Sequence, residues 1–184
     1  MRKREVPKIL IRELEKRDRD DIIDNYLAVY DEVKKNPLIG IGLFSKKPSL
    51  KEEHNWFKEL LEKIRKRESF AFVAEVDGRV VGLCEVRAID PHADYQHVCL
   101  LGILVRDGYR SMGIGSAMFE KVIRKAKERS YEILTLKVYG TNKHAQGLYK
   151  KFGFKTYGVL PKGIARGAKR IDEVLMYRRL SQQG

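Results

Sequence analysis

The sequence has little cysteine. Cys84 and Cys99 are its only two cysteines among 184 residues, and both lie inside apolar stretches. Neither belongs to a Cys-x-x-Cys or Cys/His spacing that would bind zinc, so we expect two buried thiols rather than a disulfide or a redox centre. His92 and His144 also have no second ligand at metal-binding spacing. The sequence therefore predicts no metal site.

Long apolar runs are missing as well. No stretch approaches the roughly 20 apolar residues that cross a bilayer, so we expect no membrane-spanning segment. The basic residues 1–7 lead into no apolar segment of the kind found in a secretory signal. We therefore expect a cytoplasmic protein with no membrane partner.

The length leaves little room for a second domain of ordinary size. Hydrophobic residues make up 43% of the chain and charged residues 34%, which is enough apolar material for one core. We expect a single domain over residues 1–184, with short flexible ends at about residues 1–6 and 181–184.

The excess of positive charge is concentrated in the second half of the chain. The formal net charge is +13. Residues 1–105 carry 20 Lys and Arg against 19 Asp and Glu, whereas residues 106–184 carry 18 against 6. A basic half of a domain is typical of a surface that binds an anion, which could be nucleic acid, a phosphorylated cofactor or an acidic substrate.

The first half of the sequence predicts one strand followed by two helices. Residues 9–14 form an apolar strand candidate, and apolar side chains from Ile22 to Val33 then follow helical spacing. Asn36-Pro37 ends that helix, and a loop runs to residue 48. Ser49 and Glu52 have capping-box spacing at the start of a second amphipathic helix.

From residue 69 the pattern changes to that of strands. Residues 69–76 and 79–89 flank Asp77-Gly78, which is a strong hairpin signal. The next strand, residues 96–105, is apolar from Val98 onward, so we expect it to be central in the sheet and buried on both faces. Its interior Gly102 predicts a bulge or a close backbone approach.

The remaining elements alternate between helices and strands. They are a helix that begins near residue 114, a strand at 132–138, a helix at 142–152 that Gly153 ends, and strands at 154–160 and 171–180 separated by a Gly- and Lys-rich loop at 161–169. The order is β-α-α-β-β-β-α-β-α-β-β. This order predicts an α/β (α+β) fold with a mixed sheet and helices on both sides.

One turn between a buried strand and an amphipathic helix has chemical significance. Its sequence is Arg110-Ser-Met-Gly113-Ile-Gly115. Glycines let the backbone turn tightly and leave unpaired N–H groups at the positive end of the helix, where phosphate oxygens bind. The turn lacks the Gly-Lys-Ser/Thr of a P-loop and is not Gly-x-Gly-x-x-Gly, so by itself it is weak evidence.

A second motif strengthens the interpretation. Residues 105–115, Val-Arg-Asp-Gly-Tyr-Arg-Ser-Met-Gly-Ile-Gly, resemble motif A of the GCN5-related N-acetyltransferase (GNAT) superfamily. Residues 142–154, Asn-Lys-His-Ala-Gln-Gly-Leu-Tyr-Lys-Lys-Phe-Gly-Phe, resemble motif B at the expected distance. The resemblance covers about residues 7–180. It implies the GNAT fold, a central, mostly antiparallel twisted sheet of about seven strands flanked by four helices.

The resemblance also implies a coenzyme A site and the roles of its residues. Backbone groups of one strand would pair with the pantetheine amides, the turn would hold the pyrophosphate, and Asn142 would bond the pantetheine arm or cap its helix, or do both. Tyr149 would bind at the thioester and protonate the departing thiolate, unless it is a core residue. The cofactor-binding set is Ile103, Leu104, Val105, Arg110, Ser111, Met112, Gly113, Ile114, Gly115, Ser116, Asn142 and Tyr149.

One position departs from the family pattern. Many members place a carboxylate in the strand before motif A, where this chain has Cys99. Glu85 and His97 are the substitute candidates for the catalytic base, and either could act through water. His97 has the more suitable unperturbed pKa, whereas Glu85 is an unusual residue in a mostly apolar strand. A surface salt bridge is the alternative role of Glu85.

The sequence as a whole thus predicts an acetyl-CoA-dependent N-acetyltransferase. Its acceptor would be a small-molecule amine, an amino acid or a protein N-terminus, acetylated by direct attack in a ternary complex. The segment around Arg166, Lys169 and Arg170 resembles a C-terminal hairpin that can also help to form a homodimer.

Two other functions are alternatives for this sequence. A nucleic-acid-binding module would use the basic half of the chain, but the sequence has no RNP-like aromatic pattern or zinc-finger spacing, so we do not expect nucleic acid. A non-catalytic acyl-CoA sensor is the second alternative, and it would explain Cys99 where a carboxylate is usual.

Overall fold

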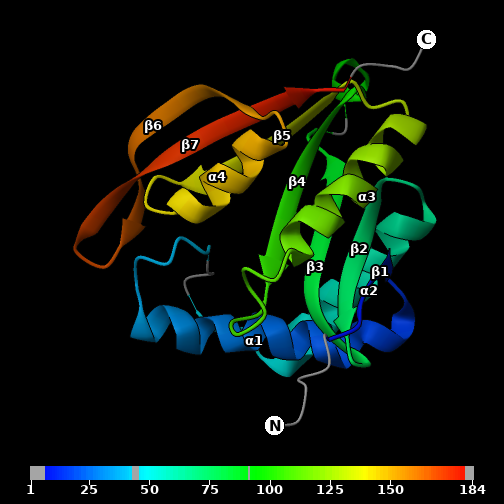
Figure 1. Ribbon diagram of the computed structural model, residues 1–184, viewed down its shortest axis with the longest axis horizontal. Helices are drawn as coiled ribbons and strands as arrows, with labels where there is room; N and C mark the ends of the chain where they lie inside the picture. Colours follow the sequence, from blue (N-terminus) through cyan, green and yellow to red (C-terminus); the bar gives the residue numbers. More distant parts are fainter. Residues whose placement is uncertain (1–6, 43–45, 91, 181–184) are drawn as a thin grey trace, which may run out of the picture.

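The computed structural model describes residues 7–42, 46–90 and 92–180, and within them one seven-stranded sheet carries four α-helices (Figure 1). The expected order of elements is confirmed; the ends at 1–6 and 181–184 lie outside the described residues. The elements are β1 Ile9–Glu13, α1 Arg19–Lys35, α2 Leu50–Arg65, β2 Ser69–Val76, β3 Arg79–Ala88, β4 Val98–Val105, α3 Ile114–Glu128, β5 Ile133–Tyr139, α4 Lys143–Lys151, β6 Lys155–Arg166 and β7 Lys169–Arg179, with 3-10 helices at Lys16–Asp18 and Ala93–Tyr95.

The strands lie in the order β1-β2-β3-β4-β5-β7-β6. Only β4 and β5 are parallel neighbours, and the other pairs are antiparallel. The α/β fold with a mixed, mostly antiparallel sheet is therefore confirmed, and β4 is the middle strand as predicted. The helix α3 connects the two parallel strands, as a parallel pair requires.

The helices cover both faces of the sheet because successive strand side chains point to opposite sides. On β2, Ala71 and Val73 pack with Phe57 of α2 in one core cluster. Phe70 and Phe72 belong to a second cluster with Phe119 of α3, on the other face. None of the helices in the described ranges has the length and apolarity of a bilayer-spanning segment.

Both cysteines are free thiols in the larger core cluster, as the sequence predicts. Cys84 on β3 and Cys99 on β4 are fully buried. Burial raises the pKa of the Cys99 thiol to about 12, because the thiolate would lose its hydration. At neutral pH Cys99 is therefore an uncharged core residue.

The helix ends use local hydrogen bonds that the sequence predicts. The Ser49 hydroxyl accepts a hydrogen bond from the Glu52 amide at 3.3 Å, and the Ser49 amide donates to the Glu52 carboxylate at 2.7 Å. Gly153 follows α4 with φ +78°, the left-handed conformation that glycine adopts without strain. The capping box and the glycine stop are confirmed.

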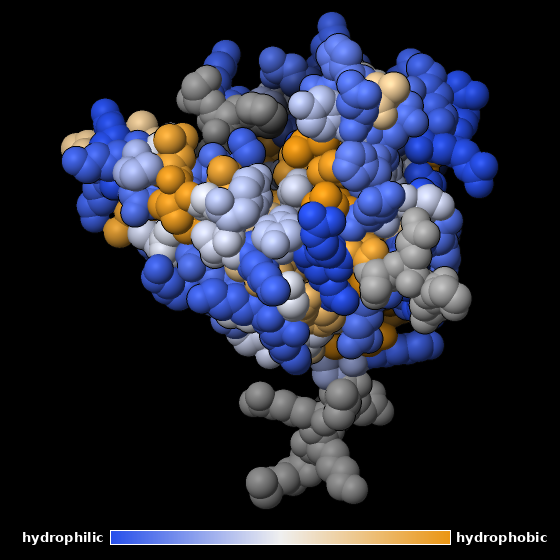
Figure 2. Space-filling view, turned by 90° about the horizontal axis from the view of Figure 1, so that it is seen from above, coloured by the Kyte–Doolittle hydropathy of each residue, from blue (hydrophilic) through white to orange (hydrophobic). Residues whose placement is uncertain are grey.

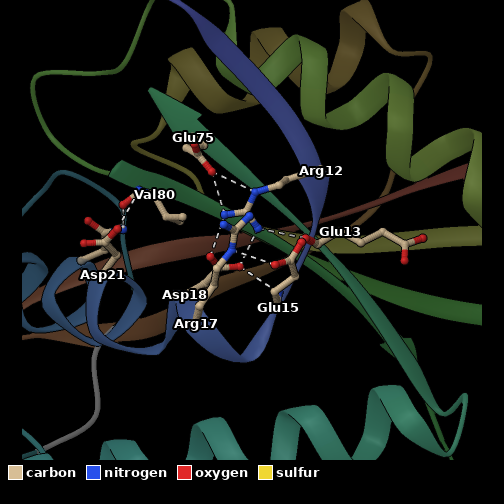
Figure 3. A network of polar contacts seen from close by, with 9 residues as sticks. Arg12, Glu13, Glu15, Arg17, Asp18, Asp21, Glu75 and Val80 are labelled. Atoms are coloured by element: carbon tan, nitrogen blue, oxygen red, sulfur yellow. Dashed lines mark hydrogen bonds and ion pairs between the residues drawn. The ribbon is translucent and has the colours of Figure 1, made fainter. Parts of the chain in front are cut away.

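A polar network fixes β1 to the start of α1 (Figure 3). Arg12 on β1 donates to the Asp18 carboxylate at 2.7 and 2.8 Å and to Glu75 on β2 at 2.8 and 2.9 Å. Asp18 also accepts from the Glu15 amide at 2.8 Å. Because the Asp18 side chain is only 2% exposed, these partners are needed to compensate its burial. The network sets the direction in which α1 leaves the sheet.

The prediction that β4 is buried on both faces is wrong. Its pairing with β5 ends at Leu100 opposite Thr135, and Gly102 is exposed. The predicted bulge or close approach at Gly102 is also absent. The β3–β4 register passes Gly102 without a shift, and nothing lies within 4 Å of the position that a Cβ would occupy. The apolar residues of β4 instead border a groove that opens where β5 diverges.

The predicted loop at 161–169 is a second error. β6 continues to Arg166, which pairs with Lys169 across the turn Gly167-Ala168. The Gly- and Lys-rich segment contains an irregularity at which the pairing of β6 with β7 shifts register, between Leu160 and Ile164. The Lys162 amide donates to Asp172 at 2.9 Å and holds this irregular segment to β7.

The β6–β7 hairpin extends beyond the helices and presents apolar side chains at the edge of the sheet. Figure 2 shows apolar surface at the side of the molecule that the hairpin occupies in Figure 1. Tyr157, Val159 and Leu160 are each at least half exposed there. The predicted homodimer stays a prediction.

Candidate active site

A groove opens where β4 and β5 separate. The two strands are paired only from Val98 to Leu100 on β4, and beyond that point each presents a free edge to a space of about 1160 Å³. The groove is lined by residues from segment 36–42, from 101–105 on β4, from the turn at 109–116, from 137–139 on β5 and from 141–151 around α4. Nearly all the cofactor-binding residues expected from the sequence thus meet in one place.

The predicted strand edge lies along one side of this groove. Ile103, Leu104 and Val105 line it, and on β4 their backbone is paired with β3 but not with β5. An extended chain with amide groups can add to such an open edge as an additional strand does. The sequence could place these residues on a strand, but not the divergence that frees their edge.

The turn before α3 leaves backbone amides unpaired at the start of the helix. Gly113 caps the helix with φ +81°, and Ser111 also has a positive φ of 63°. These conformations turn the first amides of α3 away from the helical hydrogen-bond pattern, and the first turn carries no acidic residue. Ser111, Gly113, Ile114, Gly115 and Ser116 line the groove. Met112 does not line it, and its side chain is partly exposed.

Arg110 points toward α1. Its two terminal nitrogens bind the two carboxylate oxygens of Glu32, one of them at 2.7 Å. Its Nε donates to the Val105 carbonyl at 2.9 Å. The guanidinium therefore joins α1, the end of β4 and the turn, while part of the residue still lines the groove.

Asn142 performs two structural tasks at the edge of the groove. Its Oδ1 accepts from the Ala145 amide at 3.0 Å, which is the predicted cap of α4. Its Nδ2 donates to the Gly40 carbonyl at 3.4 Å. The side chain thus holds the segment that follows α1 against α4.

Tyr149 lies where it could serve either role that the sequence left open, and its role as proton donor stays a prediction. Its ring packs in the core at 5.5 Å from the ring of Phe119 and 6.1 Å from that of Phe154. The residue also lines the groove, and its hydroxyl has no hydrogen-bond partner among the described residues. Burial raises the pKa of the Tyr149 hydroxyl, so it stays protonated at neutral pH.

The two candidate bases lie in different places. Glu85 is the cross-strand partner of Gly102, which lines the groove, and only 15% of its side chain is exposed. Burial raises the pKa of the Glu85 carboxyl, while Arg87 at 3.8 Å opposes that shift. His97 is exposed and precedes β4 at the end where β4 and β5 are paired. Neither residue itself lines the groove, but Glu85 has a direct strand partner, Gly102, that does.

Sequence reasoning missed the wall opposite β4. Lys137, Tyr139 and Glu173 line the groove from β5 and β7, and segment 38–42 covers it. Arg166 at the end of β6 donates to the Ile41 carbonyl at 2.7 Å and to the Tyr139 hydroxyl at 3.0 Å. The sequence indicates this wall only weakly, through the two glycines at 40 and 42 and one arginine in a basic hairpin.

Among the described residues, no group of three or more His, Cys, Asp or Glu side chains is arranged to hold a metal ion. The groove instead offers backbone amides, hydroxyl and amide side chains, and an apolar strand edge. These groups suit a long, partly apolar molecule that carries amides and phosphates.

Comparison with known proteins identifies the same family that the two sequence motifs resemble. Residues 28–154 match the model of the acetyltransferase (GNAT) family. An uncharacterized N-acetyltransferase of Methanocaldococcus jannaschii is 34% identical over 163 residues, which are 88% of this chain and 66% of that protein. An N-alpha-acetyltransferase of Sulfurisphaera tokodaii is 33% identical over 58% of this chain and 69% of its own length.

Among solved structures, the fold is similar to that of a putative acetyltransferase, yncA, of Salmonella typhimurium with its cofactor acetyl-CoA. The TM-score is 0.81 over 96% of each chain, at 14% sequence identity.

Proposed function

The chain belongs to the GNAT acetyltransferase family, and we propose that it transfers the acetyl group of acetyl-CoA to a primary amine. The observation that carries this proposal is the groove between β4 and β5, with an open strand edge at one side and a glycine turn at a helix N-terminus at its end. Acetyl-CoA has the groups that these two features bind, since its pantetheine arm carries amides and its nucleotide carries a pyrophosphate.

The cofactor lies along the groove in this proposal. Backbone groups of Ile103, Leu104 and Val105 pair with the pantetheine amides, and Asn142 bonds the same arm. The amides of residues 111–116 hold the pyrophosphate, and Met112 contributes only its backbone. The fold shared with a protein that was solved with acetyl-CoA supports this arrangement.

Arg110 supports the phosphate site indirectly. Its guanidinium is engaged by Glu32 and by the Val105 carbonyl, so its bonds already fix the turn relative to β4 and α1. We assign it the positioning of the turn and a contribution of positive charge near the phosphates.

The reaction is a direct transfer in a ternary complex. Acetyl-CoA supplies an activated thioester, whose acetyl group moves to the amine as the C–N bond forms and the C–S bond breaks. The backbone amide near Ile103 stabilises the oxygen that becomes negative. Glu85 accepts the proton that the amine loses, directly or through a water molecule, and Tyr149 donates a proton to the sulfur that leaves.

Two observations favour Glu85 over His97 as the base. Glu85 lies opposite Gly102, where the groove is open, whereas His97 lies beyond the paired end of the two strands. The raised pKa of Glu85 also makes its carboxylate a stronger base than an ordinary glutamate.

A second function has one observation in its favour. Cys99, in the place where many family members have a carboxylate, is buried and uncharged. A chain without a base would bind acetyl-CoA as a sensor and transfer nothing. Glu85, opposite the groove-lining Gly102, supports the enzyme instead.

Two measurements on the full chain test the proposal. Titration calorimetry with acetyl-CoA measures binding, and a thiol-release assay measures transfer to amines, amino acids and peptides with free N-termini. The proposal predicts saturable binding and acceptor-dependent release of coenzyme A. Binding without turnover of any acceptor would favour the sensor, and absence of binding would overturn both functions.

A further inference from the structure

Arg166 has no carboxylate partner among the described residues, and it bonds two residues of the groove wall without lining the groove itself. It ends β6, and its Nη2 donates to the Ile41 carbonyl and the Tyr139 hydroxyl, both of residues that line the groove. Its guanidinium also lies over the Tyr139 ring, 5.6 Å from the ring centroid. The β6–β7 hairpin therefore places the positive charge of Arg166 on the side of the groove that faces β4.

The second terminal nitrogen of Arg166 is unsatisfied. Nη1 is buried and has no hydrogen-bond partner among the described residues. By contrast, Arg12 and Arg110 each bind a carboxylate with their terminal nitrogens. A buried guanidinium nitrogen without an acceptor is costly, so a group that supplies one gains binding energy.

The same face of the sheet carries the proposed base. Leu100 pairs with Thr135, so Gly102 and its partner Glu85 lie on the face to which Lys137 and Tyr139 also belong, because side chains alternate along each strand. An acceptor whose amine reaches Glu85 therefore has Tyr139 and Arg166 on the opposite wall. The proposed base therefore lies at one side of the acceptor space. At the other side lie the Lys137–Glu173 ion pair and, behind it, Arg166, which has no carboxylate partner in the described part of the chain.

Segment 38–42 limits the size of the acceptor. The Arg166–Ile41 bond attaches this segment to the hairpin, and the Asn142–Gly40 bond attaches it to α4. It also packs closely, since a Cβ at Gly40 would lie 2.7 Å from the Cβ of Asn142. These two hydrogen bonds hold segment 38–42 over the groove. The space under it suits a small acceptor better than a polypeptide.

We propose that Arg166 binds a carboxylate of the acceptor, so that the substrate is a small primary amine that also carries a carboxylate group. This inference rests on the proposed acetyl transfer and names the substrate class of the same site. A planar carboxylate is the acceptor that a guanidinium fork binds best. Access to Nη1 requires segment 38–42 to shift, because its Ile41 carbonyl holds the neighbouring nitrogen.

The test compares matched acceptors that differ only in this group. α-Amino acids and ω-amino acids of increasing length are assayed beside their amides and the corresponding amines without a carboxylate. The wild-type protein is expected to prefer the acids in kcat/KM, and the acid series that is preferred tells whether an α- or a more distant carboxylate is bound. Arg166→Gln should reduce kcat/KM for the acids by roughly 10- to 100-fold more than for the amides and amines, so that the preference for acids is lost.

Arg170→Gln is the matched control, because Arg170 is an exposed arginine of the same hairpin that bonds only backbone carbonyls. It removes the same charge and should not change the preference for acids. If amines, amides or peptides are acetylated as well as acids, the inference is overturned while the proposed function stands.

If none of the tested acceptors is acetylated, a binding measurement tests the inference instead. The coenzyme A-loaded protein should be stabilised against heat by the acids and not by their amides, and this difference should vanish in Arg166→Gln. Equal shifts with acids and amides would overturn the inference. Failure of acetyl-CoA itself to bind would instead overturn the proposed function, together with the inference that rests on it.

Discussion

Glu85 on β3 and Gly102 on β4 are direct cross-strand partners. Gly102 has no side chain, and nothing lies within 4 Å of the position that a Cβ would take. The space on this face of β4 is therefore open beside a carboxylate that is largely buried. Glu85 does not itself line the groove, so its proposed role depends on access across Gly102, which has no side chain to block it.

This relationship predicts the pH dependence of the reaction. Burial raises the pKa of Glu85 above that of an ordinary glutamate, and a base must be deprotonated to act. In the wild type, kcat/KM should therefore fall as the pH drops through this raised pKa. Glu85→Gln should lose that acid limb and recover activity as the pH rises toward the pKa of the amine itself. The measurement is kcat/KM against pH with one acceptor.

His97→Asn is the control for the Glu85 variant. His97 is exposed and lies before the paired end of β4, so its removal should leave the profile unchanged. Parallel profiles for the wild type and both variants would mean that neither residue is the base and that the amine binds already deprotonated.

Tyr149 should act on chemistry rather than on cofactor affinity. The change Tyr149→Phe removes only the hydroxyl, so the ring can keep its contacts with Phe119 and Phe154. Because burial keeps that hydroxyl protonated, its loss should lower kcat by roughly 10²-fold if it donates the proton. Titration calorimetry checks that acetyl-CoA affinity is retained. An unaltered kcat with chemistry rate-limiting would make Tyr149 a core residue only.

The Arg110–Glu32 pair should behave as one unit. Each of Arg110→Met and Glu32→Gln breaks the same half-buried pair and should lower stability by on the order of 2 kcal/mol. If Arg110 only positions the turn, both variants should weaken acetyl-CoA binding equally, and the double variant should add little. A much larger loss of affinity in Arg110→Met than in Glu32→Gln would show direct contact with the phosphates instead.

Local features were predictable from the sequence. The capping box at Ser49 and Glu52, the left-handed Gly153 and the glycine turn before α3 all depend on residues within a few positions of one another. The order of strands and helices follows from periodicities of the same short range. The two family motifs lie on these elements.

Long-range geometry was not predictable in the same way. The divergence of β5 from β4 depends on how the whole sheet twists, so an apolar strand that borders a groove has the same pattern as one buried on both faces. Arg110 and Glu32 form an ion pair although they are 78 residues apart in the sequence. Arg166 and Ile41 form a hydrogen bond across 125 residues. The wall formed by segment 38–42 and Arg166 could be recognised only once the fold had brought these residues together.

The most direct test of the account is acetyl-CoA binding at the turn before α3. Gly113 and Gly108 have nearly the same φ, +81° and +83°, and open space around each Cβ position, but of the two only Gly113 lines the groove. Valine at either site therefore strains the backbone to a similar extent. Should either valine variant fail to fold, the corresponding pair of alanine variants allows the same comparison.

The decisive measurement is titration calorimetry of acetyl-CoA into the wild type, Gly113→Val and Gly108→Val. The account predicts that Gly108→Val keeps wild-type affinity and that Gly113→Val shows no binding, because a side chain there blocks the approach of the phosphates to the backbone. A folded Gly113→Val protein with unchanged affinity would contradict it.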